Sequence, residues 1–339
     1  MKKWLARLFG GAAGVRADAQ PGRAAGAHAS PEAGIAAAPA EPTPDIDLAF
    51  FLWLAGPHVS GAPAGAALIL DELARMARIG DGQTEAASLV PRVPAVIPQL
   101  LHSLRDQDSS AARLARQVAQ DPVLVAELIR EVNNPYYRPA TPVRNLEGAL
   151  LLLGQNGLRM LLARVAFRPV ISMQTGPLAR QLAPSLWRQS ELCALAAGLL
   201  APRHGADPFE AYLAGLMHNV GLVVALRVID GLLPAGALPD DDAFGLGLVA
   251  AARRISARIA AEWELPPAIG HAIAHIGDAA PLPATLAAAD RLAKLQLLAG
   301  GGQPAFVRAA ALLDAPERQV YDALMRSEQP DQPPQPEER

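Results

Sequence analysis

Cysteine is nearly absent from this chain of 339 residues, in which Cys193 stands alone. One cysteine excludes an intrachain disulfide and a multi-cysteine zinc site, and its apolar helical setting is typical of a small buried side chain. Such a cysteine count is also typical of proteins from a reducing compartment, so we expect the chain in the cytoplasm.

A surplus of positive charge is also missing. The 30 Lys and Arg residues face 33 Asp and Glu residues, which leaves a formal net charge of -3. A protein that neutralises the phosphates of duplex nucleic acid needs a clear basic surplus. Duplex nucleic acid is therefore not an expected partner.

Long apolar runs are missing as well, because no stretch of about 18 uncharged apolar residues occurs. We therefore expect no membrane-spanning helix. Residues 1–9 form an amphipathic start peptide, whose apolar side carries Trp4, Leu5, Leu8 and Phe9. Arg7 interrupts this peptide before it reaches the length of a signal sequence, which argues against secretion. The pattern is compatible with weak contact to a membrane surface, with docking on a protein, or with no role.

Composition divides the rest of the chain into segments. Residues 10–45 consist mainly of Ala, Gly and Pro and carry too little large apolar surface to fold, which predicts a disordered linker. Residues 46–82 contain two apolar helical patterns, each ended by glycine, which predict a short N-terminal helical hairpin. At the other end, residues 299–328 predict C-terminal helices, and the polar, Pro-rich residues 329–339 predict a disordered tail.

Helical periodicity dominates from residue 90 onward. Asp121-Pro122 and Asp207-Pro208 each place a capping residue before a proline at the first helical position, and the second of the helices predicted here carries His218. Further helices are predicted at 94–105, 110–119, 145–153, 156–166, 178–201, 243–263, 267–276, 282–298 and 304–326. Because no alternating pattern separates them, no sheet is expected and the predicted fold class is an all-α multi-helix bundle.

Five short motifs follow one another in this helical region. They are LVPRVPAVI from Leu89, DPVLVAELIREVNN from Asp121, ALLLLGQNGLR from Ala149, AGLMHNVG from Ala214, and WELPPAI from Trp263 leading to ADRLA at Ala289. In this order, over residues 90–298, they resemble the signatures of the HDOD family, an output domain related to metal-dependent HD phosphohydrolases. The resemblance implies an HD-like helical bundle that serves bacterial signalling as an output or partner-binding module, without a general enzymatic activity.

The resemblance also implies a set of former metal-site positions. The related phosphohydrolases bind their metal with a histidine, a His-Asp pair and a further aspartate. The matching positions here are Gln189, His218, Asn219 and Asp290. Two amides thus stand in place of two ligands, and an amide supplies neither the charge nor the affinity that a phosphate-polarising metal requires. We therefore expect no catalytic residue, no bound metal and no cofactor.

The histidines also have a purely structural interpretation. His218 is flanked by Gly215 and Gly221, so another helix can approach it closely, and a hydrogen-bonded core histidine is favoured over a metal ligand. His271 and His275 stand one helical turn apart, which is a spacing that metal ligands use. No third ligand accompanies them, so we expect both to be solvated.

The asparagine and the aspartate among the former metal-site positions have structural interpretations too. Asn219 can donate as well as accept hydrogen bonds, so it could join a neutral network with Gln189 and Asp290. An i,i+4 ion pair between Asp290 and Lys294 explains the aspartate equally well. Neither arrangement needs a metal.

A polar stretch outside this set could form a ligand or partner surface, and it comprises Arg113, Arg116, Arg130, Asn133, Tyr136 and Tyr137. An ordinary solvated helix face is the favoured interpretation of it. The predicted function is a non-enzymatic bacterial signalling or regulatory module that binds signalling proteins through a helical surface. One alternative is a nucleotide phosphohydrolase or phosphodiesterase with a depleted metal site on His218 and Asp290. The other is a receptor that binds a small nucleotide without turnover.

Overall fold

The computed structural model describes residues 44–56, 59–60, 65–78, 118–119, 121–134, 137, 139, 141–172, 176–233, 238–239 and 241–328. These residues are helical almost throughout, and the predicted all-α class is confirmed. Several predicted segments lie outside the described residues: the start peptide 1–9, nearly all of the linker 10–45, the helix at 94–105, most of the helix at 110–119 and the tail 329–339.

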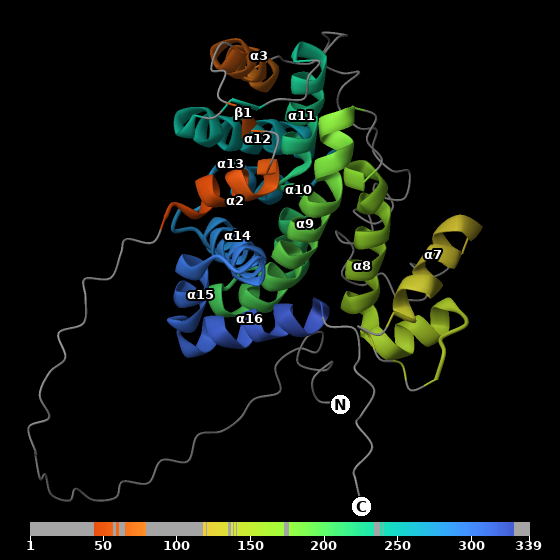
Figure 1. Cartoon of the computed structure of the whole chain (residues 1–339). Coiled ribbons are helices and arrows are strands. Elements are labelled where there is room, and N and C mark those ends of the chain that lie inside the picture. Colours follow the sequence, from red (N-terminus) through yellow and green to blue (C-terminus); the bar gives the residue numbers. More distant parts are fainter. Residues whose placement is uncertain are drawn as a thin grey trace, which may run out of the picture.

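The elements follow the chain in the order α2 (Ile46–Ala55), β1 (Val59–Ser60), α3 (Ala66–Arg78), α7 (Pro122–Val132), α8 (Leu146–Ser172), α9 (Pro177–His204), α10 (Pro208–Met217), α11 (Val220–Leu232), β2 (Leu238–Pro239), α12 (Asp242–Glu262), α13 (Pro267–Ala274), α14 (Pro281–Gly300), α15 (Pro304–Ala311) and α16 (Ala315–Glu328). Figure 1 shows α9 running through the middle of the molecule, with α8 on one side of it and α14 on the other.

α9 is the central helix of the bundle. It packs most extensively on α14 and α10, and it also packs on α8, α11 and α16. It ends at Gly205, which adopts a left-handed conformation with φ 73° that glycine reaches without steric cost. Because helices surround α9 on several sides, a polar side chain on its inner face, such as Gln189, has no exposed surface.

The helix that carries the third motif, α8, differs from the prediction only at its end. We predicted separate helices at 145–153 and 156–166, and the backbone at Gly154, with φ 71° and ψ 179°, is indeed not helical, so two helical pieces meet there. A positive φ favours glycine, which explains why the two predicted helices meet there. α8 continues to Ser172 because apolar side chains such as Phe167 keep facing the core beyond the predicted end.

The C-terminal segment contains two helices where the periodicity predicted one at 304–326. α15 ends at Ala311, and α16 begins after Asp314. The Asp314 side chain accepts a hydrogen bond of 2.8 Å from the Glu317 backbone N–H, and it therefore caps the start of a new helix. The apolar period of the two helices is similar, so the cap was the signal that the prediction missed.

The two helices predicted within 46–82 are both present, as α2 and α3. α3 packs mainly on α12, whereas α2 packs on both α12 and α14. Gly245 of α12 makes room for Phe51, since a Cβ at that glycine would lie 2.7 Å from the Phe51 ring. Gly247 accommodates Leu70 of α3 in the same way, with a Cβ 3.1 Å from its methyl groups. Because Gly245 and Gly247 point to nearly opposite faces of α12, these two approaches place α2 and α3 on different sides of that helix (Figure 1).

A parallel pairing of two residues joins β1 to β2, with Val59 opposite Leu238 and Ser60 opposite Pro239. We expected no sheet, because the sequence has no alternating apolar pattern. A pairing of two residues on each side is too short to show such a pattern.

Two helical stretches are apolar and long enough to span a membrane by length and composition alone, although the sequence analysis expected none. They are Leu146–Ser172 and Pro208–Leu232, and 61% and 94% of their most apolar windows are buried. Burial inside the bundle therefore accounts for the apolar character of both stretches.

Candidate functional site

His218 and Asn219 lie in a turn between two helices. The sequence predicted that one helix would carry both residues, whereas α10 ends at Met217 and α11 begins at Val220. The Ser256 hydroxyl of α12 supports this break, because it donates to the His218 carbonyl at 2.7 Å and accepts from the Gly221 N–H at 2.8 Å. The backbone groups that the break removes from the helical ladder are thus satisfied by a neighbouring helix.

The glycines on either side of His218 allow the close helix approaches that the sequence predicted. A Cβ at Gly215 would lie 2.5 Å from the Cα of Ala194 on α9. A Cβ at Gly221 would lie 2.0 Å from the Ala252 carbonyl oxygen on α12. Any side chain at either position would displace backbone, so these glycines hold the turn between α9 and α12.

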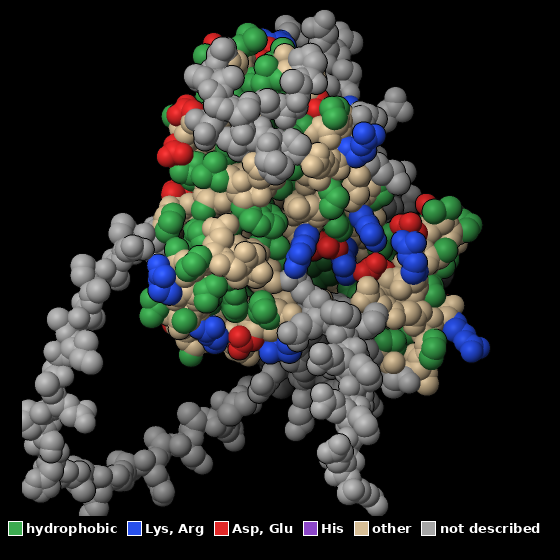
Figure 2. Space-filling view, in the orientation of Figure 1, with side chains coloured by type: hydrophobic (Ala, Val, Ile, Leu, Met, Phe, Trp, Pro, Cys, Tyr) green, Lys and Arg blue, Asp and Glu red, His purple; other side chains and the backbone are tan. Residues whose placement is uncertain are grey.

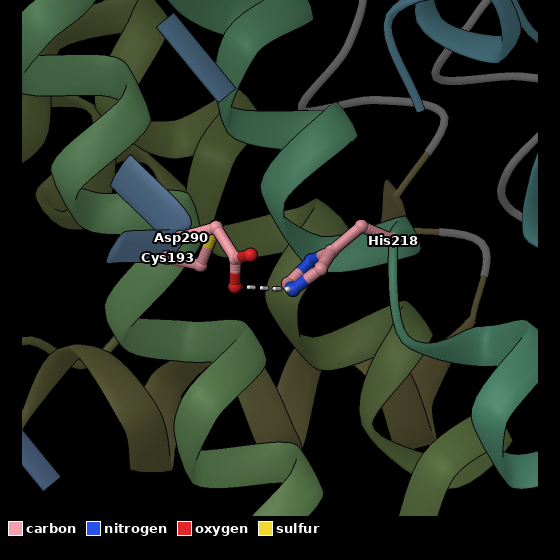
Figure 3. Close-up of side chains that lie close together, drawn as sticks. All are labelled: Cys193, His218 and Asp290. Atoms are coloured by element: carbon pink, nitrogen blue, oxygen red, sulfur yellow. Dashed lines mark ion pairs between the residues drawn. The ribbon is translucent and has the colours of Figure 1, made fainter. Parts of the chain in front are cut away.

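The His218 ring is a buried, hydrogen-bonded group, 4% exposed. Its Nδ1 lies 2.7 Å from the Gly215 carbonyl oxygen, which can only accept, so Nδ1 donates. Its Nε2 faces Asp290 Oδ1 at 3.4 Å, and Figure 3 shows this contact with Cys193 beside the carboxylate. In the structure His218 is therefore a hydrogen-bonded histidine of the core.

Amides link the former metal-site positions into one chain of hydrogen bonds. Because a carboxylate only accepts, the Gln189 amide nitrogen donates to Asp290 Oδ1, at 2.6 Å. The Gln189 amide oxygen then accepts from the Asn219 amide nitrogen, which also donates to the Ser190 hydroxyl at 3.1 Å. The predicted network of Gln189, Asn219 and Asp290 is thus present.

The network does not consist of uncharged groups alone, contrary to the prediction. Two acidic and two basic side chains meet at its edge. Lys294 Nζ lies 2.6 Å from Asp290 Oδ2 and 2.6 Å from Asp47 Oδ1 of α2. Arg253 Nη2 of α12 lies 2.7 Å from Asp47 Oδ2 and 3.4 Å from Asp290 Oδ2. The predicted Asp290–Lys294 ion pair therefore exists within a larger set of two acids and two bases. We call these residues, with Gln189, His218 and Asn219, the Asp290 cluster.

The pKa shifts of the cluster keep its charges in place. Burial raises the pKa of the Asp290 carboxyl, but Lys294, His218 and Arg253 outweigh burial and hold it far below its ordinary range. Burial lowers the pKa of Lys294, yet Asp290 and Asp47 raise it above the ordinary value of lysine. Each charged form is thus stabilised by its partner, as expected for a well-formed buried ion pair.

Cys193 also reaches this cluster, which the sequence analysis did not anticipate. Ligand atoms of Cys193, His218 and Asp290 all lie within 4.8 Å of one another. Cys193 follows Gln189 by one helical turn on α9, so the two side chains share a face of that helix. This spacing was the available signal, because Gln189 was already assigned to the former metal site.

These residues do not fit a divalent metal. A metal requires deprotonated, unoccupied ligands, whereas the Asp290 carboxylate is already bonded to the Lys294 ammonium and the Gln189 amide. Burial and the charge of Asp290 raise the pKa of the Cys193 thiol well above its ordinary value, so the thiolate that a metal would need is disfavoured. The cluster can therefore hold helices together, but its donor set does not support metal-dependent chemistry.

The polar stretch predicted as a ligand or partner surface does not form one patch among its described members. Arg130 is exposed on α7 and lies 3.6 Å from Glu127. Asn133 is held by backbone, since its amide nitrogen donates to the Val143 carbonyl at 2.8 Å and its oxygen accepts from the Val143 N–H at 2.7 Å. Tyr137 is buried. Arg113, Arg116 and Tyr136 lie outside the described residues.

The paired histidines behave as expected of surface groups. The rings of His271 and His275 lie 4.5 Å apart between centroids, and both residues are exposed. His275 Nδ1 lies 3.8 Å from Asp278 Oδ2, which is exposed as well. This arrangement has neither the burial nor the third ligand of a metal site.

Comparison with known proteins identifies the family and the fold. A model of the HDOD domain family matches residues 90–279. The chain is similar to a crystal structure of an HDOD domain protein of unknown function from Geobacter sulfurreducens, with 24% identity, a TM-score of 0.54 and coverage of 76% of this chain and 95% of that one. It is also similar to a protein from Shewanella amazonensis SB2B that is provisionally described as a metal-dependent phosphohydrolase, with 18% identity, a TM-score of 0.52 and coverage of 78% and 99%. No curated protein matches the chain.

Proposed function

This chain belongs to the HDOD family, and from that premise we propose that it is a non-enzymatic regulatory module of bacterial signalling that binds protein partners through its helices. The observation that carries the proposal is the cation inside the former metal site. Lys294 Nζ lies 2.6 Å from Asp290, the one carboxylate that remains at the positions matching metal ligands. A resident ammonium thus already neutralises the charge that would attract a metal ion.

The amides support the same proposal. Catalytic metal sites commonly use three protein ligands and keep one coordination position open for water or substrate. Here the Gln189 amide hydrogen-bonds to Asp290 and to Asn219, and the Asn219 amide nitrogen also donates to Ser190. No open polar position faces a substrate among these residues, since all of them are buried.

Apolar side chains at the surface support the partner-binding part of the proposal. Leu151 of α8 is 88% exposed and Val123 of α7 is 72% exposed, and α7 packs on α8. A contiguous exposed apolar surface is the kind of surface that a protein partner covers. We therefore propose the α7–α8 region as the part of the module that a signalling protein contacts.

Metal content tests the non-enzymatic part. Protein purified without chelators should contain no stoichiometric iron, manganese or zinc by elemental analysis, and it should not hydrolyse bis(p-nitrophenyl) phosphate with any of these metals added. Near-stoichiometric metal that disappears in His218→Ala, together with hydrolysis that the same variant loses, would overturn the proposal.

A matched pair of variants tests the partner-binding part. Pull-down from the native lysate with the full chain should retain a defined protein that Leu151→Asp fails to retain. Leu312→Asp is the control, because Leu312 is similarly exposed, at 85%, but lies between α15 and α16. If both variants retain the same proteins as the unmodified chain, the α7–α8 region is not the contact surface.

A further inference from the structure

An open groove of about 400 Å³ lies between α2 and α15. Both helices pack on α14, and the groove is the space that they leave between them. Leu48, Leu52 and Trp53 of α2 line one wall, and Phe306 of α15 lines the other. Figure 2 shows hydrophobic side chains gathered on the side of the molecule where α2, α14 and α15 lie, with few charged ones between them.

α2 is apolar on its outer side as well as on its inner side. All of its residues except Asp47 are apolar, and a helix of that composition is normally buried all round. Its inner side is indeed buried in the core, whereas Leu52 is 39% exposed and Leu48 and Trp53 are partly exposed. The outer side of α2 therefore has the composition of a contact surface, and the described residues cover it only in part.

The walls of the groove are held by the core. The Trp53 ring stacks on Phe50 with 5.6 Å between ring centroids, and its Nε1 would lie 3.3 Å from a Cβ at Gly301. Phe306 on the opposite wall is buried. Because both aromatic walls are fixed by their neighbours, an occupant does not have to order them, which lowers the cost of binding.

The size of the groove fits a short segment. An apolar cavity of about 150 Å³ in another protein holds one benzene ring, so about 400 Å³ has room for two or three large apolar side chains. An amphipathic helix that lays its apolar side into a groove is a recurring way to fill such a space. The expected occupant is therefore a short helical segment with a few large apolar side chains on one side.

The start peptide of this chain, residues 1–9, has that composition. Its sequence places four large apolar side chains, among them Trp4 and Leu8, on one side of a predicted helix and three basic residues on the other. Asp45, which is exposed and lines the groove, is opposite in charge to that basic side. The segment at the other end of the chain, residues 329–339, offers only prolines as apolar side chains and does not match the groove.

The connection between the start peptide and the groove is short enough to hold the two together. Residues 10–43 lead from the peptide to Pro44, which itself lines the groove. The disordered linker that their composition predicts spans about 30–35 Å on average. Such a tether holds its peptide at an effective concentration of about millimolar, which a second copy of the chain reaches only in concentrated solution. The tether therefore favours the peptide of the same chain as the occupant.

We propose that the groove between α2 and α15 is the docking site of the start peptide of the same chain. Trp4 and Leu8 enter the groove between Leu52 and Phe306, and the basic side of the peptide stays in water near Asp45. Docking covers the outer side of α2 and withdraws the apolar side of the peptide from water. The inference does not rest on the proposed regulatory function, because neither metal content nor the α7–α8 region depends on this groove.

Disulfide trapping in the full chain tests the proposal. Gly10→Cys places a thiol at the end of the peptide, and Val307→Cys places one on α15, one helical turn after Gln303, which lines the groove. In a glutathione buffer this pair should close at least about tenfold faster than Gly10→Cys with Leu246→Cys, because docking adds to the effective concentration that the tether gives both pairs. Leu246 is the matched control, since it is 41% exposed and Val307 is 49% exposed. Cys193 is buried and does not compete.

Two variants identify the contacts. Leu8→Asp in the peptide and Leu52→Asp in the groove should each slow closure of the Val307 pair to the rate of the Leu246 pair, because each puts a charge into an apolar contact. Ala13→Asp in the linker and Leu232→Asp on α11 are the controls and should leave the rate unchanged, and Leu232 is as exposed as Leu52. Melting curves establish that each variant is folded. Equal rates for the two pairs, or a Val307 pair that Leu8→Asp does not slow, would overturn the proposal.

Two further outcomes would give the groove or the peptide another partner, and each overturns the proposal. A disulfide that joins two chains, at a rate that rises with protein concentration, would assign the groove to the peptide of a second copy. The second outcome concerns vesicles that contain phosphatidylserine. If the unmodified chain and Leu52→Asp co-sediment with them equally, and Leu8→Asp does not, lipid covers the peptide and the groove does not hold it.

Discussion

Two charged clusters in the described part of the chain lie on opposite faces of α9, and they differ in how far their charges are shielded from water. The Asp290 cluster holds two acids and two bases, each acid bonded to both bases, in a region where Asp290 and Lys294 are almost fully buried. The Arg164 cluster, which consists of Glu131, Tyr137, Arg164 and Glu191, holds two acids around one base and lies beside a cavity of about 140 Å³. We call the Asp290 cluster closed, because its central ion pair is shielded from water, and the Arg164 cluster open, because water reaches it.

The largest effect is expected where the closed cluster is broken. Asp290→Ala removes the carboxylate that Lys294, Arg253 and Gln189 share, and it leaves a buried ammonium with less compensation. We expect the free energy of unfolding to fall by about 3–5 kcal/mol in urea denaturation. Asp278→Ala is the control, because Asp278 is exposed and should change stability by less than about 0.5 kcal/mol. A similar loss in both variants would contradict a closed cluster.

A smaller effect is expected in the open cluster. Arg164→Met leaves Glu131 and Glu191 without their shared base, but water in the adjacent cavity can solvate the carboxylates. We therefore expect a loss of about 1–3 kcal/mol in the same denaturation experiment. A loss larger than that of Asp290→Ala would show that the Arg164 cluster is the more closed of the two.

The two clusters should also respond to acid in opposite directions. The folded pKa of Asp290 is depressed, so its contribution to stability is present above its unfolded pKa of about 3.9 and is lost as pH falls further. Burial raises the pKa of Glu191 more than Arg164 lowers it, so its contribution is present below about 4.3 and is lost as pH rises through the folded value.

Urea denaturation at intervals between pH 3 and 7 measures both contributions. Asp290→Asn should flatten the decline of stability below about pH 4, and Glu191→Gln should flatten the decline that sets in above about pH 4.3. Each change in slope is at most about 1.4 kcal/mol per pH unit, the value for one proton. Slopes of the same sign for the two residues would contradict the difference between the clusters.

The smallest effect is expected at the edge of the closed cluster. Asp47 is partly exposed, with 23% of its side chain accessible, and its substitution leaves the Asp290–Lys294 pair intact. Asp47→Asn should lower stability by about 0.5–1 kcal/mol and alter the fluorescence of Trp53, which lies on the same helix. Asp71→Asn on α3 is exposed and should leave both unchanged. A cost equal to that of Asp290→Ala would mean that α2 is integral to the cluster.

The sequence predicted the polar centre of the Asp290 cluster but not its charged edge. The resemblance to the HDOD family implied that Gln189, His218, Asn219 and Asp290 lie together, and the structure does bring them into contact. Asp47 and Arg253 could not be assigned, because each reaches the cluster from a helix that only tertiary packing brings near. Their mutual contact spans 206 residues of sequence, and no spacing rule predicts a contact across that distance.

The Arg164 cluster was missed for a related reason. Arg164 and Glu191 lie on α8 and α9 and face each other across 27 residues, so no spacing within a single helix predicts their pairing. The helices themselves were easier to predict, since caps and apolar periods are local. Where the prediction failed, at Asp314, a single capping residue decided that a new helix began.

The attachment of α2 has a consequence for synthesis on the ribosome. The ion pair of Asp47 with Lys294 cannot form until Lys294 has been synthesised, 247 residues further along the chain. At about 5–20 residues per second, translation of that interval takes about 12 to 50 s. During this time Phe50, Phe51 and Leu54, which are buried in the finished protein, have no completed docking surface. The nascent chain therefore exposes the apolar side chains of α2 before their docking surface exists. A chaperone that shields them until α12 and α14 emerge would raise the yield of folded protein.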